Sequence, residues 1–323
     1  MQAGKLLGTI VLCLMAASAH AAGFRALHIR ASTNAPAISG AIWYPCSQPP
    51  GEIDLGKITL PGVKDCPLPG DRLPLIVISH GRTGSFVVHH DIAEVLADAG
   101  FIVAAVNHPG DTASDPGRSE QLAIFVERPN HIRRLIDFML GASALAPNID
   151  GVRIALFGFS RGGYTGLVLI GARPDWANAT EFCRESPPGI CRHVFKKEFP
   201  AELPIPDPRI KAAVIADPLA VFFTASSFDA IAVPVQLWAS EYGGDGVLPH
   251  SVDIVNEGLR SQHEYHVVPN AGHFSFLAPC AAALAEAAPE ICPDATGFDR
   301  LAFHRQFNAD VLVFLRKHLT GAK

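Results

Sequence analysis

The chain has 323 residues, of which 49% are hydrophobic and 18% are charged. Its length suits one large domain or two small ones. A formal net charge of −5 lacks the basic excess typical of nucleic-acid-binding proteins, so we expect no nucleic-acid partner.

The N-terminus has the pattern of a secretory signal peptide. Lys5 precedes the apolar run LLGTIVLCLMAASA, and the small residues of AHAAG follow. Such a run is shorter than the roughly 20 apolar residues of a membrane-spanning helix. We therefore expect residues 1–21 to be a signal peptide, and the protein to be exported to the periplasm or the medium without a stable membrane anchor. The alternative is a buried N-terminal helix.

The following elements predict an α/β fold. An antiparallel edge hairpin is expected from FRALHIR and ISGAIWYP, and apolar strand patterns then alternate with helical patterns. The strands are expected over 73–81, 101–110, 152–160, 210–218, 233–240 and 265–273. The helices are expected over 92–99, 132–139, 161–172 and 303–314, with Pro129 near the first turn of the second. This alternation indicates a mostly parallel sheet with helices on both faces.

Residues 173–209 interrupt the alternation. This segment is rich in proline, contains two cysteines and shows little periodicity. Long loops inside compact domains are commonly lids or binding loops, so we predict a lid-like insertion over the active site. The alternative is a surface loop without a role in binding.

Six cysteines remain after the signal peptide, and an even number in an exported chain indicates disulfides. They form three neighbouring pairs along the chain, although six cysteines allow fifteen connectivities. We expect the local pairs Cys46–Cys66, Cys183–Cys191 and Cys280–Cys292.

The sequence GFSRG, residues 158–162, lies between a predicted buried strand and a predicted helix. This is the context of a nucleophile elbow, a sharp turn that exposes a serine at the carboxyl edge of the sheet. Gly158 and Gly162 leave room for the turn. We therefore predict that Ser160 is a catalytic nucleophile.

A serine hydroxyl needs a base to accept its proton, and in this arrangement the base comes last along the chain. His273 follows the last predicted strand and is the predicted base. The sequence leaves three candidates for the acid that orients His273. Asp245 is the first choice, Asp217 at the end of the preceding strand is the second, and Glu241 is the third.

An oxyanion hole requires two N–H donors beside the attacked carbonyl. We predict the backbone N–H of Arg161, which follows the serine, and that of Arg82, which follows the strand at 73–81. Either guanidinium could bind an acidic substrate group or have a structural role.

Six motifs together resemble the α/β-hydrolases, and within them the bacterial predicted dienelactone hydrolases related to platelet-activating-factor acetylhydrolases. They are WYPC, SHGRTG, NHPGD, GFSRGG, GGDGVLP and AGHFSFLAPC. The resemblance implies a serine hydrolase of carboxylic esters that uses no metal or other cofactor. Dienelactone hydrolase itself has a cysteine nucleophile, which Ser160 does not match. In the acetylhydrolase relatives the acid follows the earlier strand, a position that corresponds to Asp217.

We therefore expect an α/β-hydrolase domain over residues 22–323 that cleaves small-molecule esters, with small or short-chain esters as the leading class. Phospholipid acetyl groups, lactones and polyesters are alternative substrates on the same fold. A catalytically inert binding protein is an alternative of another class. A metallohydrolase built on His89, His90, His108 and Asp111 is disfavoured, because their spacing fits no common ligand pattern.

Overall fold

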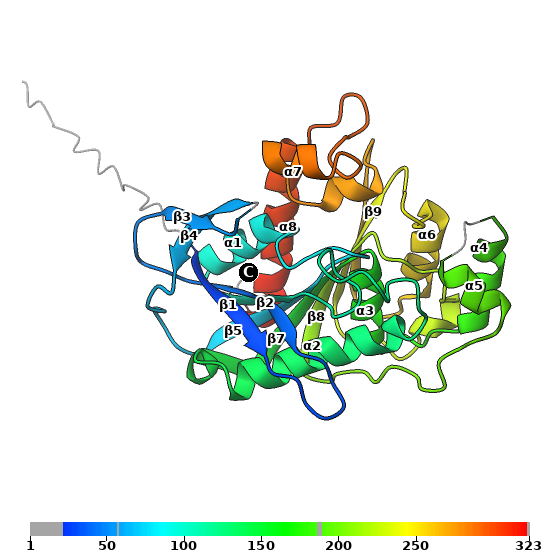
Figure 1. The fold of residues 1–323 in the computed structure, drawn as a ribbon, viewed down its shortest axis with the longest axis horizontal. Coiled ribbons are helices and arrows are strands. Elements are labelled where there is room, and N and C mark those ends of the chain that lie inside the picture. Colours follow the sequence, from blue (N-terminus) through cyan, green and yellow to red (C-terminus); the bar gives the residue numbers. More distant parts are fainter. Residues whose placement is uncertain (1–21, 57, 186–188, 322–323) are drawn as a thin grey trace, which may run out of the picture.

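The computed structural model describes residues 22–56, 58–185 and 189–321, and the predicted signal peptide at 1–21 lies outside these ranges. The described residues form a ten-stranded sheet in the order β10-β9-β8-β7-β5-β6-β2-β1-β4-β3 (Figure 1). The strands are β1 (Gly23–Ile29), β2 (Ile38–Tyr44), β3 (Gly51–Asp54), β4 (Thr59–Lys64), β5 (Leu73–Ser79), β6 (Ile102–Val106), β7 (Ile149–Phe159), β8 (Ile210–Ala216), β9 (Val235–Ser240) and β10 (His263–Val268).

The six strands from β10 to β6 are parallel, as the alternation of strands and helices predicted. The hairpin of β1 and β2 is antiparallel, and β2 joins β6. A second hairpin, β3 and β4, was not predicted. It continues the sheet beyond β1, so it occupies the outer edge that the first hairpin was expected to form.

Helices cover both faces of this sheet. The α-helices of the described residues are α1 (His90–Asp98), α2 (Ile124–Gly141), α3 (Arg161–Leu169), α4 (Ala179–Glu185), α5 (Ile190–Phe195), α6 (Pro249–Gly258), α7 (Ala282–Ala287) and α8 (Arg300–Leu319). Successive residues of β5 point to opposite faces: Leu75 and Val77 pack with α2 and α3, whereas Ile76 and Ile78 pack with α1 and α8. The sequence of a strand that is buried on both faces is therefore a continuous apolar run.

The second predicted helix is longer than expected. It begins at Ile124, so Pro129 lies inside α2 rather than near its first turn. A proline inside a helix costs about 3 kcal/mol. Ile124 and Phe125 are fully buried, and burial of each such side chain contributes about 1.5–3 kcal/mol, which offsets that cost.

The segment 173–209 differs from the predicted lid. It contains α4 and α5, which lie at the end of the molecule opposite β3 and β4 (Figure 1). Trp176, Cys183 and Ile190 are buried in the core on the α2 and α3 side of the sheet. The segment is thus anchored to the body of the domain.

All three expected disulfides are present: Cys46–Cys66, Cys183–Cys191 and Cys280–Cys292. Among the described residues, no helix combines the length and the apolar character needed to cross a membrane.

Candidate active site

Ser160 lies on a strained turn between β7 and α3. Its φ of 57° and ψ of −119° fall in a region that side-chain-bearing residues rarely occupy. A Cβ atom added to Gly158 would lie 2.2 Å from the Gly162 carbonyl oxygen. One added to Gly162 would lie 1.8 Å from the carbonyl oxygen of Ser79. The turn therefore requires glycine at both positions, as the motif predicted.

His273 and Asp217 form a buried hydrogen-bonded pair. Nδ1 of His273 lies 2.6 Å from Oδ2 of Asp217, and each side chain is 1% exposed. The Ser240 N–H and hydroxyl both donate to this carboxylate, over 2.8 Å each. Because the fixed carboxylate accepts a hydrogen bond from Nδ1–H, Nε2 is left as an acceptor. Nε2 is buried and has no hydrogen-bond partner in the described ranges, and His273 lines the same cavity as Ser160.

The structure does not place Asp245, the first choice of acid, beside His273. Oδ1 of Asp245 lies 2.5 Å from Nη2 of Arg82, so its carboxylate pairs with this guanidinium rather than with His273. The loop before Asp245 contacts His273 through backbone, since the His273 N–H donates to the Gly243 carbonyl over 2.8 Å. Glu241 accepts a hydrogen bond from the N–H of Asn270, which is a structural contact.

The two predicted oxyanion donors have different surroundings. Arg161 is the first residue of α3, so its N–H has no acceptor within the helix. In the loop after β5, the Thr83 N–H donates to Oδ1 of Asp111 over 3.1 Å. The Arg82 N–H has no such acceptor among the described residues, and Arg82 lines the cavity. Both backbone groups are therefore available as donors.

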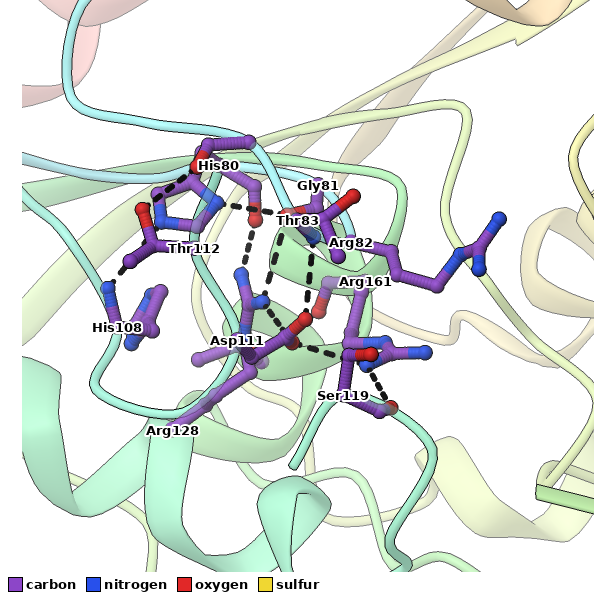
Figure 2. A network of polar contacts seen from close by, with 12 residues as sticks. His80, Gly81, Arg82, Thr83, His108, Asp111, Thr112, Ser119, Arg128 and Arg161 are labelled. Carbon is purple, nitrogen blue, oxygen red and sulfur yellow. Dashed lines mark hydrogen bonds and ion pairs between the residues drawn. The ribbon is translucent and has the colours of Figure 1, made fainter. Parts of the chain in front are cut away.

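Asp111 joins the two segments that carry these donors (Figure 2). Its Oδ2 accepts hydrogen bonds from Arg128 at 2.6 Å and from Arg161 at 2.9 Å. All three side chains are at most 3% exposed. Burial alone would raise the pKa of Asp111, but the two guanidinium groups outweigh it and lower the pKa. Two cations and one anion leave net positive charge behind the loop. This Asp111 cluster was not predicted.

His80 shapes the same loop (Figure 2). Its Nδ1 lies 2.7 Å from the Gly81 carbonyl, and its Nε2 accepts from the His108 N–H over 3.2 Å. Burial, followed by the charge of Arg128, lowers the pKa of His80 to about 3, so the ring is neutral. Arg128 also donates to the His80 carbonyl. The loop is therefore held by the His80 side chain, by the backbone of His108 and by Arg128 of α2.

The residues considered for a metal site have other partners. His108 Nε2 lies 2.9 Å from the Ser79 hydroxyl, and His90 Nδ1 lies 2.9 Å from Oε1 of Glu94. His89 packs edge-on against Phe157 and Phe159. Within the described ranges, no group of three or more His, Cys, Asp or Glu side chains is arranged to hold a metal ion.

Ser160 and His273 line a cavity of about 620 Å³. Its walls are mainly apolar, and they include Ile58, Val87, Val88, Phe159, Phe274, Leu277, Leu284 and Ile291. No described residue of 173–209 is among them, so the described part of this segment does not form the predicted lid over the cavity. The segment that follows His273, including α7, forms that wall instead.

The whole fold is similar to a solved structure. A ferulic acid esterase from Streptomyces cinnamoneus superposes with a TM-score of 0.67 at 18% sequence identity, over 93% of this chain and 91% of that one. The fold is that of the α/β-hydrolases. This confirms the fold class expected from the sequence.

Parts of the sequence also match named families. Residues 51–123 match the family model of platelet-activating factor acetylhydrolase, isoform II, and residues 88–179 match that of the prolyl oligopeptidase family. A platelet-activating factor acetylhydrolase from Canis lupus familiaris is 28% identical over 156 residues, which span 35% of this chain and 35% of that protein. The expected resemblance to acetylhydrolases of this fold is confirmed.

Proposed function

We propose that this protein is a serine hydrolase of carboxylic esters, with Ser160 as nucleophile, His273 as base and Asp217 as the orienting acid. The observation that carries the proposal is the buried pair of His273 and Asp217 beside a cavity that Ser160 also lines. The names of the similar proteins, an acetylhydrolase and an esterase, support the same reaction class.

The reaction follows from the assigned roles. Ser160 Oγ attacks the ester carbonyl while Nε2 of His273 accepts its proton. The imidazolium then returns this proton to the leaving alcohol, and an acyl-enzyme remains. Water attacks the acyl-enzyme by the same route and releases the acid. Asp217 accepts a hydrogen bond from the Nδ1–H of His273 and stabilises the imidazolium in both halves of the reaction.

The oxyanion of each tetrahedral intermediate would accept hydrogen bonds from the Arg82 and Arg161 N–H groups. Preorganised donors of this kind contribute a large part of the rate enhancement in enzymatic acyl transfer. The Arg161 N–H also lies at the N-terminus of α3, where the helix dipole favours negative charge. The net positive charge of the Asp111 cluster acts in the same direction.

A fluorophosphonate probe and p-nitrophenyl acetate test this proposal on the purified protein. We expect covalent labelling of the wild type and none of Ser160→Ala, with turnover of p-nitrophenyl acetate reduced at least about 10⁴-fold in the variant. Absence of labelling and of turnover in correctly folded wild type would instead support the inert binding protein. Equal turnover by wild type and variant would refute the assigned nucleophile.

A phospholipid acetyl ester is a second candidate substrate. The match of residues 51–123 to the acetylhydrolase model favours it, and this range includes the loop that carries Arg82. Release of acetate from an acetylated phospholipid, measured beside p-nitrophenyl acetate, separates the two. A kcat/KM for the phospholipid at least equal to that for the simple ester would establish this candidate.

We also propose export to the periplasm or the medium. The signal-like pattern of residues 1–21 and the three disulfides support it, because disulfides persist in oxidising compartments. N-terminal sequencing of protein recovered from the periplasm or medium is the test. A mature chain that begins near Ala22 is expected, and retention of residues 1–21 in a cytosolic product would contradict it.

A further inference from the structure

One wall of the active-site cavity comes from a short loop closed by a disulfide. This loop, residues 280–292, is closed by Cys280–Cys292 and contains α7. Six of its residues line the cavity: Cys280, Ala281, Leu284, Ala288, Glu290 and Ile291. Five of these are apolar, like most of the other residues that line the cavity. The loop therefore adds a binding surface beyond the groups that carry out the reaction.

Contacts outside the disulfide fix this loop to the catalytic histidine. Arg300 donates to both carboxylate oxygens of Asp294 and to the Ile291 carbonyl. The Ser275 hydroxyl donates to the same Asp294 over 2.8 Å. Ser275 lies two residues after His273 in the same short helical turn, His273–Phe276. The wall is thus held at a set position relative to the reacting atoms.

The charges at the cavity are paired within the protein or are negative. Arg82 lies against Asp245 and Glu120, at 2.5 and 3.1 Å. His90 lies against Glu94, and Glu290 adds a further carboxylate to the lining. Among the described lining residues, each basic side chain therefore faces a carboxylate, and an anionic ligand would lack a free counter-ion. Desolvating an unpaired anion in an apolar cavity is costly.

We propose that the preferred substrates are neutral esters with an apolar group of several carbons, which binds against loop 280–292. This inference rests on the proposed function and names its substrate class. A cavity of about 620 Å³ lies in the range that encloses drug-sized ligands, and an acetyl group fills little of it. This proposal differs from the expectation of small or short-chain esters that was drawn from the sequence. Leu284 and Ile291 are the specificity-determining residues of this wall.

Two ester series test the substrate class and show which side of the ester is bound. One holds the p-nitrophenyl group constant and lengthens the acyl chain from acetate to octanoate. The other holds acetate constant and lengthens the alcohol from ethyl to octyl. Because each buried methylene group is worth about fourfold, kcat/KM should rise at least about tenfold along one series. A flat or falling profile in both series overturns the inference.

A further pair of esters tests whether the preferred substrate is neutral. The p-nitrophenyl monoester of suberic acid has the same chain length as p-nitrophenyl octanoate but ends in a carboxylate. We expect its kcat/KM to be at least about tenfold lower than that of the octanoate, because the anion would be desolvated without a partner. An equal or higher value for the suberate overturns the claim of a neutral substrate.

Substitutions in α7 locate the binding surface. Leu284→Trp fills the cavity and should lower the ratio of octanoate to acetate kcat/KM at least about tenfold. Its matched control is Ala285→Trp, an exposed neighbour on the same helix that does not line the cavity. If the two ester series show that the long group is on the alcohol side, the ratio of kcat/KM for octyl acetate to that for ethyl acetate is measured instead. An unchanged ratio in Leu284→Trp, or equal changes in both variants, overturns the role of the loop.

The disulfide offers a second pair of variants. Replacing Cys280 and Cys292 together by serine loosens the wall and should lower the same ratio, whereas replacing Cys183 and Cys191 should leave it unchanged. Fluorophosphonate labelling reports on the reactive serine independently of chain length. Labelled protein without a chain-length preference refutes this inference alone, whereas absence of both labelling and turnover refutes the proposed function with it.

Discussion

Nδ1 of His273 lies 2.6 Å from Oδ2 of Asp217, and neither side chain has appreciable contact with solvent. Asp217→Asn removes the acceptor that selects the Nδ1–H tautomer. We therefore expect kcat for p-nitrophenyl acetate to fall about 10⁴-fold, with a smaller change in KM. Steady-state kinetics measure both values. Near-normal kcat in a correctly folded variant would show that Asp217 has no catalytic role.

Asp245→Asn is the counterpart of that substitution. Its carboxylate pairs with the partly exposed Arg82, and such pairs contribute at most about 1 kcal/mol. We expect kcat/KM to stay within about fivefold of wild type under the same assay. A loss comparable to that of Asp217→Asn would instead restore Asp245 as the triad acid, the first choice from the sequence.

Removing the charge of Asp111 leaves two buried guanidinium groups without their carboxylate. For Asp111→Asn we expect the free energy of unfolding to fall by about 3–5 kcal/mol, measured by urea denaturation. We also expect kcat to fall more than KM rises, because the loop bearing the Arg82 N–H loses its anchor. Asp150→Asn is the matched control.

Asp150 pairs with Arg72 and Arg153 near the start of β7, whereas Ser160 follows the end of that strand. Its substitution should reduce stability without changing kcat of the folded protein. If both variants lower kcat alike, the effect of Asp111 reflects general destabilisation and not the position of the oxyanion loop.

Buried neutral histidines predict a loss of stability in acid. Burial lowers the pKa values of His80, His89 and His131 to about 3, against about 6.5 in the unfolded chain. Between these values the unfolded state binds more protons, so stability rises with pH from about 3 to 6.5 and is lost as the pH falls. Each group contributes a slope of up to about 1.4 kcal/mol per pH unit.

Two variants isolate this contribution from that of the carboxylates. His131→Gln should flatten the dependence of the unfolding free energy on pH over that window, because it removes one titrating group. The exposed His28→Gln should leave the slope unchanged. Urea denaturation at several pH values gives both slopes, and identical slopes for the two variants would contradict the role assigned to burial.

The parallel part of the fold could be predicted because each buried strand is a continuous apolar run and each covering helix has one apolar face. The glycines around Ser160 were also informative, since only a sharp turn requires them at that spacing. The β3 and β4 hairpin was missed. Its two strands include two glycines and a proline and have only short apolar stretches, so they give a weak strand signal.

The acid was harder to predict because Asp217, Glu241 and Asp245 all follow strands that end at the same edge. What separates them is tertiary geometry: the Asp217 carboxylate lies 2.6 Å from Nδ1 of His273 and accepts two hydrogen bonds from Ser240. The Asp111 cluster likewise combines three segments far apart in sequence, so no local pattern reveals it. The segment 173–209 resembled a lid in composition, but several of its apolar residues, among them Trp176, Ile190 and Val194, pack in the core.

The close approach of Gly162 to the Ser79 carbonyl limits how this protein could diversify. The start of α3 and the end of β5 meet backbone to backbone, with no side chain between them. The distance between the Arg82 and Arg161 N–H groups, which would stabilise the developing negative charge, is therefore determined by the packing of the main chain. The surrounding loops could change during evolution to bind new compounds while this backbone contact stays the same. One methyl group added at residue 162 would force the two segments apart.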